Sequence, residues 1–273
     1  MIRFAANLGL LWPGLPLTGR MEAAARAGFA AIETQFPYDT SPVAVRRLSN
    51  ELNISLLGIN SPPGDVVGGE MGFAALPGRE NDFMDSIDQA IEYCGVSGFR
   101  SIHVMAGNVS AYPSNDCRQV FVSNLGWAAA RASQYGIKLL IEPLNKFDRP
   151  DYFYSTIDEG ISVLADIAHP NVRLQFDAYH AGIYCRDVVA ALRRGWQWIG
   201  HIQIAAVPDR GEPDESEVDM IAVIRTAEAL GYSGWISCEY CPRKDTDQGL
   251  GWMRRFLLEE MHQSERIQSG EPT

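Results

Sequence analysis

Eight polar residues stand where apolar, strand-like runs of this chain stop, and the last four of them all carry side-chain oxygens. Those four are Glu142, Asp177, Gln203 and Glu239. Carboxylate and amide oxygens are the ligands that hard divalent cations select in proteins. The other four are Asn7, Glu33, Asn60 and His103. The spacing therefore predicts a metal site, provided that the fold brings these strand ends together.

Three carboxylates brought to one point would repel each other. Two unit charges about 4 Å apart interact by about 4 kcal/mol at an effective dielectric of about 20. A divalent cation removes that conflict, and the all-oxygen set favours Mg²⁺ or Mn²⁺. Zn²⁺ stays open, because His180 and His201 lie close to two of the four in the sequence. The alternative is that each carboxylate is separately ion-paired or solvated in its own loop.

The same residues could move protons. A cation that binds a carbonyl oxygen and the neighbouring hydroxyl polarises the carbonyl and acidifies the C–H bond between them. Glu142 and Glu239 could then flank a substrate as base and acid, taking a proton from one carbon and returning it to the next through an enediolate. The pattern favours isomerisation or epimerisation.

A scaffold must bring these strand ends to one place. Apolar strands that alternate with helical segments predict a parallel sheet, and eight such units predict an α/β fold, a single (β/α)8 TIM barrel with its site at the C-terminal ends of the strands. The expected strands are 3–8, 30–35, 54–59, 100–105, 137–142, 172–177, 199–204 and 234–239. The expected helices are 17–27, 42–52 with Ser41 as N-cap, 79–94, 114–135, 156–168, 187–195, 218–230 and 246–262.

One domain accounts for the chain. We expect the barrel to span residues 1–263, because this fold typically needs about 250 residues, and residues 264–273 to form a disordered tail. Two loops exceed the usual length of a strand-to-helix connection. One is 61–72, and the other is 205–217, which is acidic and interrupted by Pro and Gly. The second is a candidate lid.

Composition excludes some classes of partner. The net charge is −11 and the sequence pI is about 4.9, whereas binding of nucleic acid or an acidic membrane requires Lys and Arg. No apolar stretch reaches the roughly 18 residues of a spanning helix, and the first residues fit a barrel strand better than a signal peptide. Five scattered cysteines predict reduced thiols. We therefore expect a cytoplasmic protein without a nucleic-acid or membrane partner; a homo-oligomer is compatible with the sequence.

Several motifs run in order along nearly the whole chain. They are Arg3-Phe-Ala-Ala-Asn-Leu, Ile141-Glu-Pro-Leu-Asn, Phe176-Asp-Ala-Tyr-His, Gly200-His-Ile-Gln-Ile-Ala, Asp209-Arg-Gly-Glu-Pro, Cys238-Glu-Tyr-Cys-Pro and Gly249-Leu-Gly-Trp. Together they resemble the hydroxypyruvate isomerase family of the xylose isomerase-like TIM barrels, over residues 1–256. Two further motifs, His103-Val-Met-Ala-Gly and Pro208-Asp-Arg, are similar to a sister group that isomerises 2-oxo-tetronates.

The resemblance implies an aldose–ketose isomerase of a small hydroxy-oxo acid, which converts hydroxypyruvate to 2-hydroxy-3-oxopropanoate (tartronate semialdehyde). It implies that Glu142 and Glu239 form the proton-transfer pair. It also implies a divalent metal held by Glu142, Asp177, Gln203 and Glu239. The alternatives are a 2-oxo-tetronate isomerase, a sugar 3-epimerase of the same superfamily, and a non-catalytic barrel that binds sugar acids. A DNA-cleaving metal barrel would need several histidine ligands and a basic groove, and five histidines with a charge of −11 argue against it.

An anionic substrate needs positive charge and hydrogen-bond donors. Arg210, in the candidate lid, could grip a carboxylate through two hydrogen bonds, or it could pair with Glu212 or Asp214. Glu212 is a further candidate contact with the substrate. His180, three residues past Asp177, could donate to the substrate or orient a metal ligand. His103 could contact a substrate hydroxyl, or be purely structural.

Overall fold

The computed structural model describes residues 2–256. The expected tail, 264–273, and residues 257–263 of the expected barrel lie outside the described part of the chain. Within it, parallel strands form a barrel in the order β3-β2-β1-β9-β8-β7-β6-β5-β4. The strands are β1 (Phe4–Asn7), β2 (Ala31–Glu33), β3 (Ser55–Leu56), β4 (Gly58–Asn60), β5 (Ser101–His103), β6 (Lys138–Ile141), β7 (Val172–Asp177), β8 (Ile199–Ile204) and β9 (Ile236–Cys238). The predicted α/β barrel is confirmed.

Strands β3 and β4 are the two halves of the third expected strand, and Leu57 separates them. The N–H of Leu57 donates to the carbonyl of Ile32 at 2.8 Å, and its carbonyl accepts from the N–H of Ser101 at 3.0 Å. One half pairs with β2 and the other with β5. The barrel therefore closes through this residue, and eight strand positions surround the axis as predicted.

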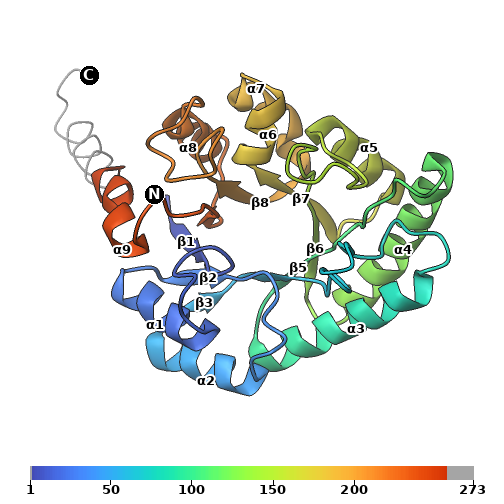
Figure 1. Cartoon of the computed structure of the whole chain (residues 1–273), viewed down its shortest axis with the longest axis horizontal. Helices are drawn as coiled ribbons and strands as arrows, with labels where there is room; N and C mark the ends of the chain where they lie inside the picture. Colours follow the sequence, from blue (N-terminus) through green and yellow to red (C-terminus); the bar gives the residue numbers. More distant parts are fainter. Residues whose placement is uncertain (1, 257–273) are drawn as a thin grey trace.

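Helices form an outer ring around the strands (Figure 1). They are α1 (Leu17–Arg26), α2 (Pro42–Leu52), α3 (Glu80–Ser97), α4 (Ser114–Ser133), α5 (Ile157–Ile167), α6 (Ala178–Tyr184), α7 (Val188–Gly195), α8 (Met220–Ala229) and α9 (Thr246–Gly249). Residues 251–256 are helical again after a turn at Leu250. The expected helix 246–262 is thus interrupted at Leu250, and its end lies outside the described residues. No described helix is both long and apolar enough to cross a membrane.

Local signals set some helix boundaries and not others. Pro42 opens α2 as predicted, but the side chain of Ser41 makes no capping hydrogen bond. Helix α5 begins with a capping box instead, in which Thr156 Oγ1 accepts from the N–H of Glu159 and the carboxylate of Glu159 accepts from the N–H of Thr156.

The sequence did not predict α6. Its N-cap is Asp177, whose Oδ1 accepts from the N–H of Tyr179 at 2.8 Å. Strand β7 thus passes directly into a helix, so that the residue ending the strand also begins the helix. This short helix carries His180 and turns its side chain toward the strand ends.

The long loop after β4 folds back on the barrel rim. Gly72 forms an isolated antiparallel bridge with Ala106 and has a φ of +98°. A Cβ atom there would lie 2.2 Å from the carbonyl oxygen of Met105. Only glycine fits such a close approach, so this residue fixes one side of the site's mouth.

Candidate active site

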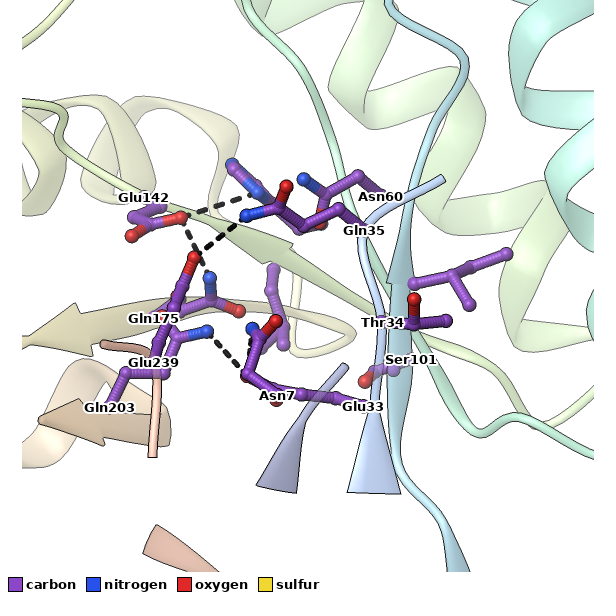
Figure 2. Close-up of a pocket in the computed structure, with 14 residues that line it drawn as sticks. Asn7, Glu33, Thr34, Gln35, Asn60, Ser101, Glu142, Gln175, Gln203 and Glu239 are labelled. Atoms are coloured by element: carbon purple, nitrogen blue, oxygen red, sulfur yellow. Dashed lines mark hydrogen bonds and ion pairs between the residues drawn. The ribbon is translucent and has the colours of Figure 1, made fainter. Parts of the chain in front are cut away.

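The C-terminal ends of the strands meet at one pocket, as predicted (Figure 2). Its lining includes seven of the eight polar residues that end the expected strands: Asn7, Glu33, Asn60, His103, Glu142, Gln203 and Glu239. The eighth, Asp177, has an oxygen within 4.8 Å of ligand atoms from Glu142 and His180. Asp177 and Gln203 are also register neighbours across β7 and β8. The fold therefore brings all four proposed cation ligands to the same end of the barrel.

Each of these four residues has one buried oxygen without a hydrogen-bond partner. The atoms are Glu142 Oε1, Asp177 Oδ2, Gln203 Oε1 and Glu239 Oε2. Buried polar atoms are nearly always hydrogen-bonded. Four unsatisfied oxygens from neighbouring strand ends match the donor set of a hard divalent cation, so the residues present fit such an ion.

The protein holds the second oxygen of each glutamate through a side-chain amide. Gln175 Nε2 donates to Glu142 Oε2 at 2.7 Å, and Gln35 Nε2 donates to Glu239 Oε1 at 2.9 Å. One oxygen of each carboxylate is thereby fixed while the other stays unpartnered, as Figure 2 shows for the labelled pairs. Neither glutamine was identified from the sequence. Gln175 lies two residues before Asp177 on β7, so the alternation of a strand could have placed it on the inner face.

The pKa values of the three carboxyls are raised. Burial is the largest cause for Glu142, and the charges of Glu239 and Asp177 raise its pKa further. Burial also raises the pKa of Asp177 and of Glu239, while the Arg210 guanidinium opposes the rise in both. Burial raises the pKa of Glu239 to about 8, so this carboxyl can hold or release a proton near neutral pH, which suits acid–base catalysis.

Arg210 lies against these carboxylates rather than against the loop acids considered from the sequence. Its Nη2 is 3.2 Å from Glu239 Oε1 and 3.7 Å from Asp177 Oδ2, and the guanidinium stacks 5.0 Å from the ring centre of Tyr179. Burial acts to lower its pKa, but the carboxylates outweigh it and the pKa is raised. The φ of Arg210 is +55°, a conformation that costs a non-glycine residue on the order of 1 kcal/mol. The loop therefore holds the guanidinium of Arg210 at the site although the backbone there is strained.

The hydrogen bonds of His180 determine its tautomer. Its Nδ1 accepts from the backbone N–H of Asn145 at 3.1 Å, and Asn145 Nδ2 lies 2.8 Å from the same atom. Burial lowers the pKa of His180 well below its usual value, so the ring is neutral and its proton sits on Nε2. That nitrogen lies 3.8 Å from Glu142 Oε1 and 3.7 Å from Asp177 Oδ2. Distance alone would allow it to bind a metal, but a protonated nitrogen is a donor and not a ligand.

His103 also faces the pocket. Its Nδ1 is 3.3 Å from Glu142 Oε2, yet neither ring nitrogen makes a well-formed hydrogen bond. Burial lowers its pKa to about 4, so the ring is neutral. A buried ring with both nitrogens unsatisfied beside the acid–base pair is placed to contact a substrate hydroxyl, and that role stays a prediction.

Glu212 is not brought to this pocket. Its Oε2 lies 3.1 Å from Arg243 Nη1, and both carboxylate oxygens also accept from the N–H of Arg243. Arg243 further binds Asp209, and Asp214 pairs with Arg255. The predicted role of Glu212 as a substrate contact finds no support in this placement, because its carboxylate anchors the loop 205–217 to the segment after β9.

The pocket opens outward through a second set of side chains. Phe36, Met71, Met105 and Leu144 supply apolar walls beside Glu142, His180, Arg210 and Glu239. Arg149 lines the same opening, is exposed, and has no ion-pair partner among the described residues. Arg149 lies on the loop after β6, beyond Asn145, and the local sequence gave no reason to identify it as a site residue.

Comparison with known proteins agrees with this fold. The family model of the xylose isomerase-like TIM barrel matches residues 21–256. A 2-oxo-tetronate isomerase of Cupriavidus necator is 43% identical over 258 residues, which cover 94% of this chain and 99% of that protein. A putative hydroxypyruvate isomerase of Mus musculus is 39% identical over 263 residues, which cover 93% of this chain and 95% of that protein.

A solved structure is also similar. The crystal structure of an AP endonuclease, family 2, from Brucella melitensis has a TM-score of 0.91 and 38% sequence identity to this chain. The match covers 93% of this chain and 99% of that one. Some of the proteins that are similar to this chain along nearly its whole length are thus named isomerases, and another is named an endonuclease.

Proposed function

Because the chain belongs to the xylose isomerase-like TIM barrel family, we propose that it is an aldose–ketose isomerase of a small hydroxy-oxo acid. Hydroxypyruvate, which would become 2-hydroxy-3-oxopropanoate, is the first candidate substrate. A 2-oxo-tetronate is the second candidate, and it is supported by the 43% identity to an isomerase of that name. The observation that carries the proposal is the pair Glu142 and Glu239, both buried at one pocket, each with a raised pKa and one unpartnered oxygen.

In this proposal Glu142, Asp177, Gln203 and Glu239 hold a divalent cation, with Mg²⁺ or Mn²⁺ favoured over Zn²⁺. Their four unpartnered oxygens support it, and the proton on His180 Nε2 leaves an all-oxygen donor set. When bound, such an ion polarises a carbonyl and neutralises charge that develops on oxygen.

The two glutamates move the proton. One takes the proton from the hydroxyl-bearing carbon, the electron pair of that C–H bond forms the double bond of an enediol, and the carbonyl oxygen gains a proton. The other glutamate then gives a proton to the former carbonyl carbon, while the first hydroxyl oxygen loses its proton and becomes the new carbonyl oxygen. The new carbonyl is an aldehyde when the substrate is hydroxypyruvate and a ketone when it is a 2-oxo-tetronate. Atoms and electrons balance without a redox partner, as an isomerisation requires.

The substrate carboxylate needs a positive group that the site does not already use. Arg210 is engaged by Glu239 and Asp177, whereas Arg149 stands at the opening without an ionic partner among the described residues. We assign the carboxylate to Arg149, with His180 Nε2–H and His103 as donors to the substrate oxygens. The apolar side chains at the opening, such as Met71 and Leu144, would limit the length of the substrate.

The nuclease name of the Brucella melitensis relative raises a second candidate. A nuclease of this kind must bind phosphates with Lys and Arg. Here the pocket is lined by Glu142 and Glu239, and its partly buried arginine, Arg210, is already paired with carboxylates. This charge pattern favours a small substrate over DNA.

Proton NMR in D2O tests the proposal. The purified protein, stripped with EDTA, is incubated with hydroxypyruvate or with a 2-oxo-tetronate, with and without Mg²⁺ or Mn²⁺. We expect hydroxypyruvate to give an aldehyde, and a 2-oxo-tetronate to give a 3-oxo acid, each with solvent deuterium in the carbon skeleton. We also expect dependence on added metal, and the faster substrate identifies the subgroup. Deuterium at C3 of the 2-oxo-tetronate together with loss of its optical rotation, without a 3-oxo product, would instead indicate a 3-epimerase. No turnover of either acid with metal present would overturn the proposed isomerase and favour a binding barrel.

A further inference from the structure

A buried hydrogen-bond network lies beneath the proposed cation site and centres on Glu33 (Figure 2). Glu33 ends β2 and is 5% exposed. Its Oε1 accepts from Asn7 Nδ2 at 2.8 Å and from Gln203 Nε2 at 2.7 Å. Its Oε2 lies 2.6 Å from His201 Nε2. Glu33 is therefore held by side chains from β1 and β8.

Without a hydrogen-bond partner, the side-chain amide of Gln203 could adopt either of two orientations. Its oxygen and its NH2 group have nearly the same size, so packing alone does not decide which faces the cation site. An ionised carboxylate only accepts hydrogen bonds, and the group next to Glu33 must therefore be the NH2. The oxygen then faces away from Glu33, and it is one of the four buried oxygens without a partner.

We infer that Glu33 is a positioning residue that sets the amide of Gln203 so that its oxygen, not its nitrogen, faces the proposed cation site. The amide nitrogen has no lone pair to give to a metal, and its protons would repel one. A turned amide would thus remove one of four ligands and add an unfavourable dipole. This inference rests on the proposed cation site, because it assigns a supporting residue to one of its ligands.

His201 and Asn7 restrain Glu33 in turn. His201 lies two residues before Gln203 on β8, so both side chains point to the same face of the sheet and both reach Glu33. The two oxygens of Glu33 are then each engaged, and the carboxylate cannot rotate away from Gln203. The orientation of the amide is therefore built into three strands and does not depend on the loops.

Mn²⁺ binding by variants at positions 33 and 203 tests the inference. The readout is the dissociation constant from titration of the EDTA-stripped protein, followed by the electron paramagnetic resonance of free Mn²⁺. Glu33→Gln replaces the acceptor-only group with an amide that can meet either face of the Gln203 amide. We expect Mn²⁺ to bind roughly 10- to 100-fold more weakly, the usual effect of changing a residue that orients a metal ligand. Glu51→Gln, at an exposed position on α2, controls for the loss of one negative charge.

A double variant that exchanges the residues at positions 33 and 203 distinguishes a role in orienting the amide from a purely structural role. In Gln203→Glu either end of the side chain is an oxygen, so orientation no longer matters. We therefore expect the double variant, Glu33→Gln with Gln203→Glu, to bind Mn²⁺ no more weakly than Gln203→Glu alone. In the double variant the amide at position 33 would donate a hydrogen bond to the carboxylate at position 203, so that one donor again faces one acceptor. A purely structural or electrostatic role of Glu33 would instead weaken binding equally in both backgrounds.

Each outcome supports or overturns the inference. If the wild-type protein binds no Mn²⁺, the proposed cation site fails. If it binds but Glu33→Gln binds within twofold of it, or the loss is equal in both backgrounds, only the role of Glu33 is overturned. If Glu33→Gln does not fold, circular dichroism of the double variant gives the answer, because the exchanged pair should restore both the fold and Mn²⁺ binding, and failure to restore them would contradict the inference.

Discussion

A glutamate exchanges protons with carbon most efficiently at neutral pH when its pKa lies near that pH. Burial and neighbouring carboxylates raise the pKa of Glu142, and burial raises that of Glu239. Replacing either by glutamine keeps an oxygen for a cation but removes the proton carrier. We expect Glu142→Gln and Glu239→Gln each to lower kcat by roughly 10²- to 10⁴-fold, measured by deuterium incorporation into the substrate.

The matched control for this pair is Glu51→Gln, which should leave kcat unchanged because Glu51 is exposed on α2, where its ion-pair partner is Arg47. Mn²⁺ binding by the two active-site variants separates chemistry from ligation. A variant that still binds Mn²⁺ and turns over within a few-fold of wild type would refute the two-glutamate mechanism.

Arg149 carries the second prediction at the residue scale. Hydrogen bonds to a charged group contribute about 1.5 to 3 kcal/mol, so Arg149→Gln should raise the KM for a hydroxy-oxo acid by roughly tenfold or more and change kcat little. Arg194→Gln, an exposed arginine paired with Asp158, is the control. Steady-state kinetics decide the point, and an unchanged KM would return the substrate carboxylate to Arg210.

The sequence located the proposed ligand oxygens but not their supports. These oxygens belong to residues that end predicted strands, namely Glu142, Asp177, Gln203 and Glu239. In a barrel the C-terminal ends of all strands lie at the same end of the molecule, so their location follows from the fold. Gln35 and Arg149 sit on loops, whose paths depend on contacts distant in sequence, such as that of Gln35 with Glu239. The pairing of Glu212 with Arg243 was not predicted either, because the two residues are distant in the sequence and no local pattern indicates it.

At the scale of elements, strands with strong apolar runs were predicted to the residue, such as β7 and β8. The break at Leu57 was not, because it arises from pairing with two different neighbours at once. Helix α6 was missed because Asp177 was interpreted only as a strand end, although aspartate is also a preferred N-cap. Tertiary pairing and dual roles therefore limit what local patterns can predict.

The helix caps give a prediction at this scale. Thr156 accepts a hydrogen bond from the N–H of Glu159 within the capping box of α5, so Thr156→Ala should lower the free energy of unfolding by about 1 kcal/mol. Ser41 holds the same position at α2 without a side-chain bond, so Ser41→Ala should change it by less than about 0.5 kcal/mol. Urea unfolding of both variants makes the comparison. Equal losses would show that the capping box does not stabilise α5.

At the scale of the whole molecule, the site concentrates negative charge in a protein that already carries a net charge of −11. Glu142, Asp177 and Glu239 are buried together, and Arg210 is the one arginine paired with them among the described residues. Glu33 lies beneath them, and the neutral rings of the two pocket histidines add no positive charge. Without a metal, part of this charge must be removed by bound protons.

The pH dependence of stability follows from these protons. The folded protein keeps protons on carboxyls that ionise at their ordinary pKa in the unfolded chain, so the unfolded chain binds fewer protons and the free energy of unfolding falls as pH rises. The window runs from the ordinary histidine value of 6.5 up to the pKa of Glu239, which burial raises to about 8. Below 6.5 the unfolded chain also protonates His103 and His180, whose pKa values burial lowers in the fold, and this opposes the effect of the carboxyls. The slope is at most about 1.4 kcal/mol per pH unit for each carboxyl that retains its proton. We expect the EDTA-treated protein to be less stable at about pH 8 than at about pH 6.5.

Divalent metal should oppose that loss, because a cation held by the same oxygens replaces the protons and binds more tightly as they leave. An ion at about 100 times its dissociation constant adds about 2.7 kcal/mol to stability. Urea unfolding with EDTA and with Mn²⁺ across this pH range measures both effects. The stabilisation by Mn²⁺ should grow with pH in the wild-type protein and grow less in Glu239→Gln, which has one such carboxyl fewer. A stabilisation that is the same at every pH would show that the ion and the protons do not compete for these carboxylates.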